Sequence, residues 1–208
     1  MANETDLLND ALGQIGASRI NAIDDGSINA NYCQTFYPTL RDGMLRAHHW
    51  NFNEGRVSLA LDVEVPPFEY AFQYSLPADY LKVRRYYGGM PTVLDLSWLG
   101  WLDWNSLNSY IRDNYQIVEN KKLLSNDSIA LIVYSRRVEN PDLWDPIFYQ
   151  GIACALASKL ASAITKDDRK SDALLKKAEA LYFPLAMAVD GQENPVTPFI
   201  VDNLTWGR

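Results

Sequence analysis

The longest apolar stretch of the chain, residues 145–165, predicts its central helix. Large apolar side chains recur there at helical spacing, and the positions between them are small. A helix with this pattern packs against neighbours on several sides. Asp145 followed by Pro146 is typical of an N-cap with proline at the first helical position. The stretch is nearly as long as a membrane span, but its polar side chains, including Gln150 and Lys159, favour a helix inside a soluble helical layer.

Three further segments have helical spacing. Residues 4–15 carry one apolar stripe and end before a glycine, and residues 28–49 form a longer helix in which Pro38 predicts a kink or a break. Residues 167–189 follow the central helix after a short polar link, so we expect an antiparallel hairpin that is bent near Pro184. The buried side of the second helix is predicted to hold Ile28, Tyr32, Phe36, Leu40, Met44 and Ala47, with Asn29, Gln34, Arg41 and Arg46 elsewhere. The stripe of the last helix is predicted to hold Leu174, Leu175, Ala178, Leu181, Tyr182, Leu185 and Ala186.

Between these helices the hydrophobic period changes from helical to alternating. Turn residues recur roughly every 8–12 positions, which is typical of short antiparallel strands. We expect polar turns at 119–122 and 125–128, while 56–61 fits either a helix or a strand. The predicted strands are 70–76, 81–87, 91–96, 115–119 and 129–135.

These patterns predict an α+β fold, mainly an α-helical bundle with an inserted small antiparallel β domain and an extended C-terminal tail. The N-terminal half of the helical part is assigned to residues 1–67 and the β unit to residues 68–136. Residues 137–190 would complete the helical domain as a hairpin, and residues 191–208 would form the tail.

Composition excludes several partners. The chain has 208 residues, 48% of them hydrophobic, and a net charge of −7. It therefore lacks the clustered Lys and Arg needed to wrap nucleic acid, and it has no basic amphipathic face for an anionic membrane. Cys33 and Cys154 lie in predicted helices, and we expect both to be small buried side chains. With no signal-peptide pattern at residues 1–4, we expect folding in a cytoplasm.

Motifs of common enzyme chemistry are absent from the sequence, including GxxxxGK[ST], a GxGxxG after a strand, HExxH and CxxC. His48 and His49 are neighbours that would point about 100° apart on a helix, so helix-end or core contacts are favoured over a metal or catalytic role. Asp24 and Asp25 could be a carboxylate pair, but a turn or N-cap is favoured. A Ser-His-Asp triad stays open because triads are recognised by geometry, although no GxSxG elbow supports one. We predict no enzyme activity, no cofactor and no metal site.

Two apolar features exceed what a plain core requires. The first is Trp98, Trp101 and Trp104, which are spaced three apart within the β unit. They could form the minicore of the sheet, stack on a sugar, or dock on a protein partner on the tail side, since Trp is enriched at interface hot spots. The second lies in the C-terminal segment, which either folds back on its own domain or anchors on another chain as an extended strand. The candidate anchors are Val196, Phe199, Ile200, Val201, Leu204 and Trp206.

Four segments carry a resemblance to a known family. Residues 11–16 read ALGQIG, and after the turn DDGS the next helix finishes in LRAHHW. Residues 74–85 read YSLPADYLKVRR, and residues 136–148 read RRVENPDLWDPIF before the central helix. In order and spacing, residues 5–190 resemble the head-to-tail adaptor (connector) proteins of tailed phages, which include the tail tubular protein A of short-tailed phages.

The resemblance implies a virion protein at the head–tail junction, assembled in the host cytoplasm. Such adaptors form a ring, usually of twelve subunits, that binds beneath the portal protein and extends the DNA channel. The helical part would form the ring wall, the β part would face the tail nozzle or tail tube protein, and the C-terminal tail would reach the portal. An acidic wall would let DNA slide past without specific binding.

Two other classes of function stay open at this point. In a carbohydrate-binding or hydrolytic tail protein, the tryptophans would stack on a polysaccharide and two acids nearby, Asp95 and Asp103, would be the candidate carboxylates. The chain could also be a freestanding helical ligand-binding domain. The adaptor differs from both in having interfaces as its only sites.

Overall fold

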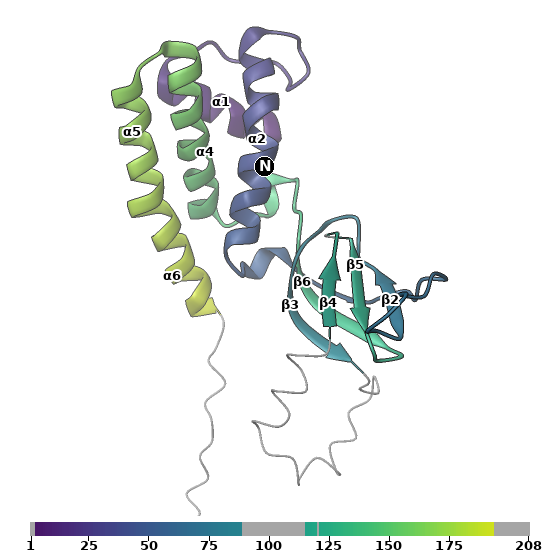
Figure 1. Cartoon of the computed structure of the whole chain (residues 1–208). Coiled ribbons are helices and arrows are strands. Elements are labelled where there is room, and N and C mark those ends of the chain that lie inside the picture. Colours follow the sequence, from purple (N-terminus) through teal and green to yellow (C-terminus); the bar gives the residue numbers. More distant parts are fainter. Residues whose placement is uncertain (1–2, 89–114, 120, 194–208) are drawn as a thin grey trace, which may run out of the picture.

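The computed structural model describes residues 3–88, 115–119 and 121–193. It shows a mixed α+β chain, with helices gathered on one side and antiparallel strands on the other (Figure 1). The helices are α1 (Glu4–Ile15), α2 (Ile28–Ala47), α4 (Pro146–Leu160), α5 (Asp168–Lys177) and α6 (Phe183–Glu193). The strands are β1 (Glu54–Ser58), β2 (Phe72–Ser75), β3 (Tyr80–Gly88), β4 (Tyr115–Val118), β5 (Lys122–Ser125) and β6 (Ala130–Arg136).

Helix α4 is the centre of the helical side, and it contacts α1, α2, α5 and α6. Asp145 caps it by accepting hydrogen bonds from the backbone N–H groups of Ile147 and Phe148, as the sequence predicted. Gly151 lets α6 approach, because a Cβ there would lie 2.7 Å from the ring of Phe183. The stretch Pro146–Thr165 has the length and apolar content of a membrane span, but 61% of its most apolar window is buried within the protein, as in a core helix.

The buried face of α2 differs from the predicted one. Its buried side chains are Ala30, Cys33, Tyr37, Arg41 and Leu45, one position further along than the expected stripe. Ile28 is 74% exposed, and Ala47 is exposed as well. The small side chains Ala30 and Cys33 fill this face, and the larger predicted residues pack only at its edge. The helix also continues through Pro38 without a break.

The last helical segment is divided by a π-helical turn, Ala178–Tyr182, which separates α5 from α6. A wide turn before Pro184 is a known way to accommodate a proline that lacks an N–H. The turn moves the buried line to Phe183, Ala186 and Asp190. Leu181 and Leu185, which were predicted to be buried, are therefore 50% and 46% exposed. Leu175, which was also predicted to be buried, lies on α5 before the turn and is 41% exposed. Helix α6 also runs to Glu193, so the residues 191–193 assigned to the tail are helical.

Two three-stranded antiparallel sheets, β1-β6-β3 and β2-β5-β4, form the other side of the molecule. The chain after β1 runs on beside β2, where the Asp62 N–H donates to the Gln73 carbonyl at 2.8 Å. At the opposite side, the rings of Tyr86 on β3 and Tyr115 on β4 lie 4.8 Å apart. The sheets thus curve around one apolar core, whose buried members are Leu59, Tyr74, Val83, Tyr86, Leu123, Ala130, Ile132 and Tyr134.

Two strands differ from the sequence prediction. The ambiguous run at 56–61 begins within strand β1, so the sheet starts before the expected boundary at residue 68. Strand β5 was not predicted: its first and last residues, Lys122 and Ser125, were assigned to two separate turns. It buries Leu123 and Ser125 completely. The predicted strand at 91–96 lies outside the described residues.

Candidate functional site

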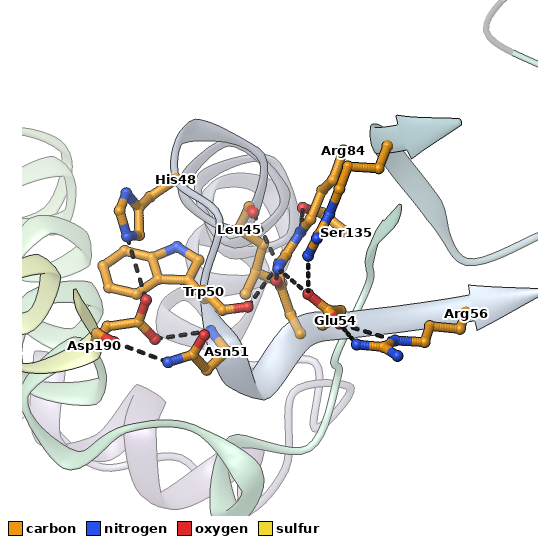
Figure 2. A network of polar contacts seen from close by, with 11 residues as sticks. Leu45, His48, Trp50, Asn51, Glu54, Arg56, Arg84, Ser135 and Asp190 are labelled. Carbon is orange, nitrogen blue, oxygen red and sulfur yellow. Dashed lines mark hydrogen bonds and ion pairs between the residues drawn. The ribbon is translucent and has the colours of Figure 1, made fainter. Parts of the chain in front are cut away.

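The junction between the helices and the sheets is the most elaborate polar site of the described chain (Figure 2). Here α2 ends at Ala47, and residues 48–53 lead directly into β1. The end of α6 lies against this linker on one side, and strands β3 and β6 lie against it on the other. We call the contacts of residues 48–54 with α6, β3 and β6 the junction.

Arg84 holds the sheet side of the junction. Its guanidinium donates to the Trp50 carbonyl at 2.5 Å, to the Ser135 hydroxyl at 2.9 Å and to the Asn53 side chain. It also pairs with Glu54 at 3.3 Å, and its side chain is only 5% exposed. Burial lowers the pKa of Arg84, while the Glu54 carboxylate acts in the opposite direction, and a guanidinium stays charged in either case.

A break in strand register explains why Arg84 reaches the linker. The pairing of β3 with β6 shifts between Val83 and Arg85, and such bulges redirect a side chain from the alternation of its strand. Because Arg84 bonds to a linker carbonyl, a linker side chain and β6 at once, it fixes the direction in which β1 leaves the helices.

Asp190 holds the helical side of the junction. This carboxylate is 95% buried, and it accepts a hydrogen bond of 2.7 Å from the Asn51 backbone N–H. The Asn51 side chain donates in turn to the Asp190 carbonyl at 2.8 Å. The second carboxylate oxygen lies 3.3 Å from Nε2 of His48. These contacts fasten the end of α6 to the linker.

Aromatic side chains of the helical core pack against the linker. The Trp50 ring lies 4.6 Å from that of His48 and 4.7 Å from that of Phe148 on α4, and its indole N–H donates to the Met44 carbonyl at 3.0 Å. Phe148 also contacts the rings of Phe52, Trp144 and Phe183. The linker is therefore part of the helical core and not a free hinge.

A second group of arginines joins α2 to the sheets. Arg46 donates to the Leu81 carbonyl at 2.6 Å, and Arg137 pairs with Asp42 at 2.8 Å. Arg41, which the sequence placed off the buried face, is only 7% exposed and also pairs with Asp42 at 2.9 Å. Two separate clusters thus set the orientation of the sheets on the helices.

The contacts of the junction hold the helices and the sheets to the linker. His48 contacts a carboxylate and an aromatic ring, as expected of a helix-end histidine, and the described residues contain no group of three or more His, Cys, Asp or Glu that could hold a metal. Asp25 stabilises a turn, as favoured by the sequence, because its carboxylate accepts hydrogen bonds from the backbone N–H groups of Ser27 and Asn21. A hydrogen bond with the Ser27 side chain, followed by those from the backbone of Ser27 and Asn21, lowers the pKa of its carboxyl.

The predicted partner-binding residues lie outside the described residues. This holds for Trp98, Trp101 and Trp104, for Asp95 and Asp103, and for the anchors Val196, Phe199, Ile200, Val201, Leu204 and Trp206. The structure gives only the points from which they continue. Gly88 and Tyr115 border the tryptophan segment at the end of the sheets away from the helices, and Glu193 is the last residue of α6 (Figure 1).

No family model matches the chain, and no curated protein sequence matches it. The resemblance to phage adaptors therefore stays a prediction.

Proposed function

We propose that the chain is a structural subunit of a phage head-to-tail adaptor. In this proposal, copies of the chain form a ring, usually of twelve, between the portal protein and the tail nozzle or tail tube protein. The helical side forms a bundle in the ring wall, and an extended C-terminal tail reaches the portal. DNA passes through the acidic ring without specific binding.

One observation carries the proposal: three of the four segments that resemble the adaptor family supply contacts where the helices meet the sheets, some at the junction and some in the second group of arginines. LRAHHW supplies Arg46 and Trp50, and YSLPADYLKVRR supplies Arg84. RRVENPDLWDPIF supplies Arg137 and Phe148. These distant segments thus come together between the two parts of the chain, where they hold the helices and the sheets to one another.

The places where the predicted partner segments leave the body also support an adaptor. The tryptophan segment leaves from the outer end of β3 and β4, and the C-terminal segment follows the end of α6 at the junction (Figure 1). A rigid body with two separate attachment points suits a protein that connects two others. Its polar clusters hold the helices and the sheets in one orientation.

The test is a binding experiment with the portal protein of the same phage. We expect the purified chain to co-elute with the portal as a ring. Deletion of residues 194–208, which starts after the last described turn of α6, should abolish portal binding and leave the melting temperature nearly unchanged. A variant with Trp98, Trp101 and Trp104 changed to Ser should still bind the portal and fail to recruit the tail.

The control is Leu143→Ser, which removes an exposed apolar side chain on the helical side without touching either segment. No complex between the wild-type chain and the portal would contradict the proposal. Cleavage of a host polysaccharide by the wild-type chain would favour the carbohydrate-active alternative instead.

A further inference from the structure

The outer face of the β1-β6-β3 sheet carries a shallow groove of about 440 Å³. Its floor holds Leu131 and Val133 of β6, and its sides hold Arg56 and Ser58 of β1 and Arg85 and Tyr87 of β3. These side chains alternate with those that point into the sheet core. The groove therefore lies on the outer face of the same sheet, where Leu131 is half-buried and Val133 is only 5% exposed.

Two arginines flank the centre of the groove. Both Arg56 and Arg85 lie opposite Val133 in the strand register, and their side chains are 75% and 57% exposed. The nearest described carboxylate is Glu54, which forms ion pairs with Arg56 at 3.0 Å and with Arg85 at 3.9 Å. Glu54 also pairs with Arg84 at 3.3 Å. One carboxylate thus faces three guanidinium groups, so the groove is locally positive on a chain whose net charge is −7.

The complementary surface is a loop at the edge of the sheets, residues 61–70. Its apolar side chains point into solvent, with Val63, Val65 and Phe68 at 102%, 68% and 71% exposure. Two acidic residues lie among them: Glu64 and Glu69 are also exposed, and Glu64 pairs with Lys122 of its own chain at 3.1 Å. The loop projects from the sheets beside β2 (Figure 1). Among the described residues, no member of this loop lines the groove of its own chain.

We propose that the 61–70 loop of one copy docks in the groove of a second copy. Val63, Val65 and Phe68 supply apolar side chains for the floor around Leu131 and Val133, while Glu64 and Glu69 pair with Arg56 and Arg85. Electrostatic complementarity of this kind fixes partner and register. The occupant is a second copy because the same chain carries both halves of a contact that is apolar in its middle and opposite in charge at its edges.

The contact joins two different patches, so it is heterologous. Such contacts close into rings when the rotation between copies permits and otherwise make open chains. The inference rests on the proposed function, because it names one contact by which adaptor subunits would meet in their ring. Self-association can nevertheless be measured without the portal, which separates a failure of this contact from a failure of the function.

The test uses two variants that each lose one half of the contact. The groove variant is Arg56→Glu with Arg85→Glu, and the loop variant is Val63→Ser with Phe68→Ser. Sedimentation of the wild-type chain up to millimolar concentration should show growing oligomers, and each variant alone should associate at least tenfold more weakly. An equimolar mixture should stop at a 1:1 dimer, because it retains one intact loop and one intact groove for each pair.

The matched controls are Arg136→Glu, an exposed arginine at the end of β6, and Leu143→Ser, an exposed leucine on the helical side. Both should associate like the wild-type chain. If circular dichroism shows that the groove variant does not fold, Arg56→Gln with Arg85→Gln replaces it. A wild-type chain that stays monomeric, variants that associate normally, or a mixture that forms no dimer would each overturn the proposal.

Discussion

Replacing Arg84 by methionine should destabilise the protein far more than the same change at Arg85. Methionine keeps most of the length and apolar stem of Arg84 and removes its hydrogen bonds and charge. Arg85 is the matched control, because it is adjacent in the same strand, 57% exposed, and only 3.9 Å from the same carboxylate. The comparison isolates what the buried guanidinium contributes to the junction.

The magnitude follows from the groups left behind. Asn53 and Ser135 are fully buried, and leaving a buried polar group unsatisfied costs about 1–3 kcal/mol each. Glu54 would also lose its most buried partner, and breaking a buried ion pair costs about 3–5 kcal/mol in total. We therefore expect Arg84→Met to lower the free energy of unfolding by about 3–5 kcal/mol. An exposed pair such as that of Arg85 contributes only about 0–1 kcal/mol.

The assay is denaturation by urea and by heat, each followed by circular dichroism and by tryptophan fluorescence. At about 2–4 °C per kcal/mol for a chain of this size, the melting temperature of Arg84→Met should fall by roughly 6–20 °C. If the junction joins the two parts energetically, the two probes should separate in Arg84→Met and coincide in Arg85→Met. Equal and small effects at the two positions would refute the role given to Arg84.

Three further predictions test the helical side. Leu156→Ala, at a fully buried position of α4, should lower the free energy of unfolding by about 2–5 kcal/mol, and a free energy of unfolding within about 1 kcal/mol of the wild-type value would show that α4 is not central. Asp190→Ala should speed amide exchange across α6 at least tenfold, while Glu193→Ala at the exposed end of the same helix should not. Burial raises the pKa of the Cys33 thiol to about 11 from 9.0, so its stabilising effect is full below pH 9.0 and is lost as the pH rises to about 11. Cys33→Ala should flatten the stability profile over that range, and an unchanged slope would contradict the assignment.

The helical core could be predicted because its signal is local. Residues 145–165 combine a cap, a proline and several apolar turns in one stretch, and α4 begins as that pattern requires. The same reasoning chose the wrong face of α2. Ala30 and Cys33 are too small to dominate a hydrophobic pattern, yet they fill the face that packs, and the larger Tyr32 and Phe36 remain at its edge.

Features that depend on tertiary context were missed. The π-helical turn before Pro184 shifts the buried line of α6, and no count of helical spacing includes such a turn. Strand β5 is only four residues long and its two ends were assigned to turns, so its pairing with β2 and β4 was not predicted.

The junction itself could not be predicted from the sequence. Arg84 binds residues 50–54 and Ser135, and Asp190 binds Asn51, so its members are brought together only by the fold. The one local signal was Asp190, an acid at the end of an otherwise apolar helical stripe. A buried carboxylate at such a position requires partners, and this could have pointed to the linker.

The most direct test of the adaptor assignment is an image of the head–tail junction of the particle that contains this chain. The account predicts a ring of copies directly beneath the portal, with a density for each copy that fits residues 3–88 and 121–193 as one body joined at Arg84 and Asp190. Finding the chain elsewhere in the particle, or finding no copy of it there, would contradict the account.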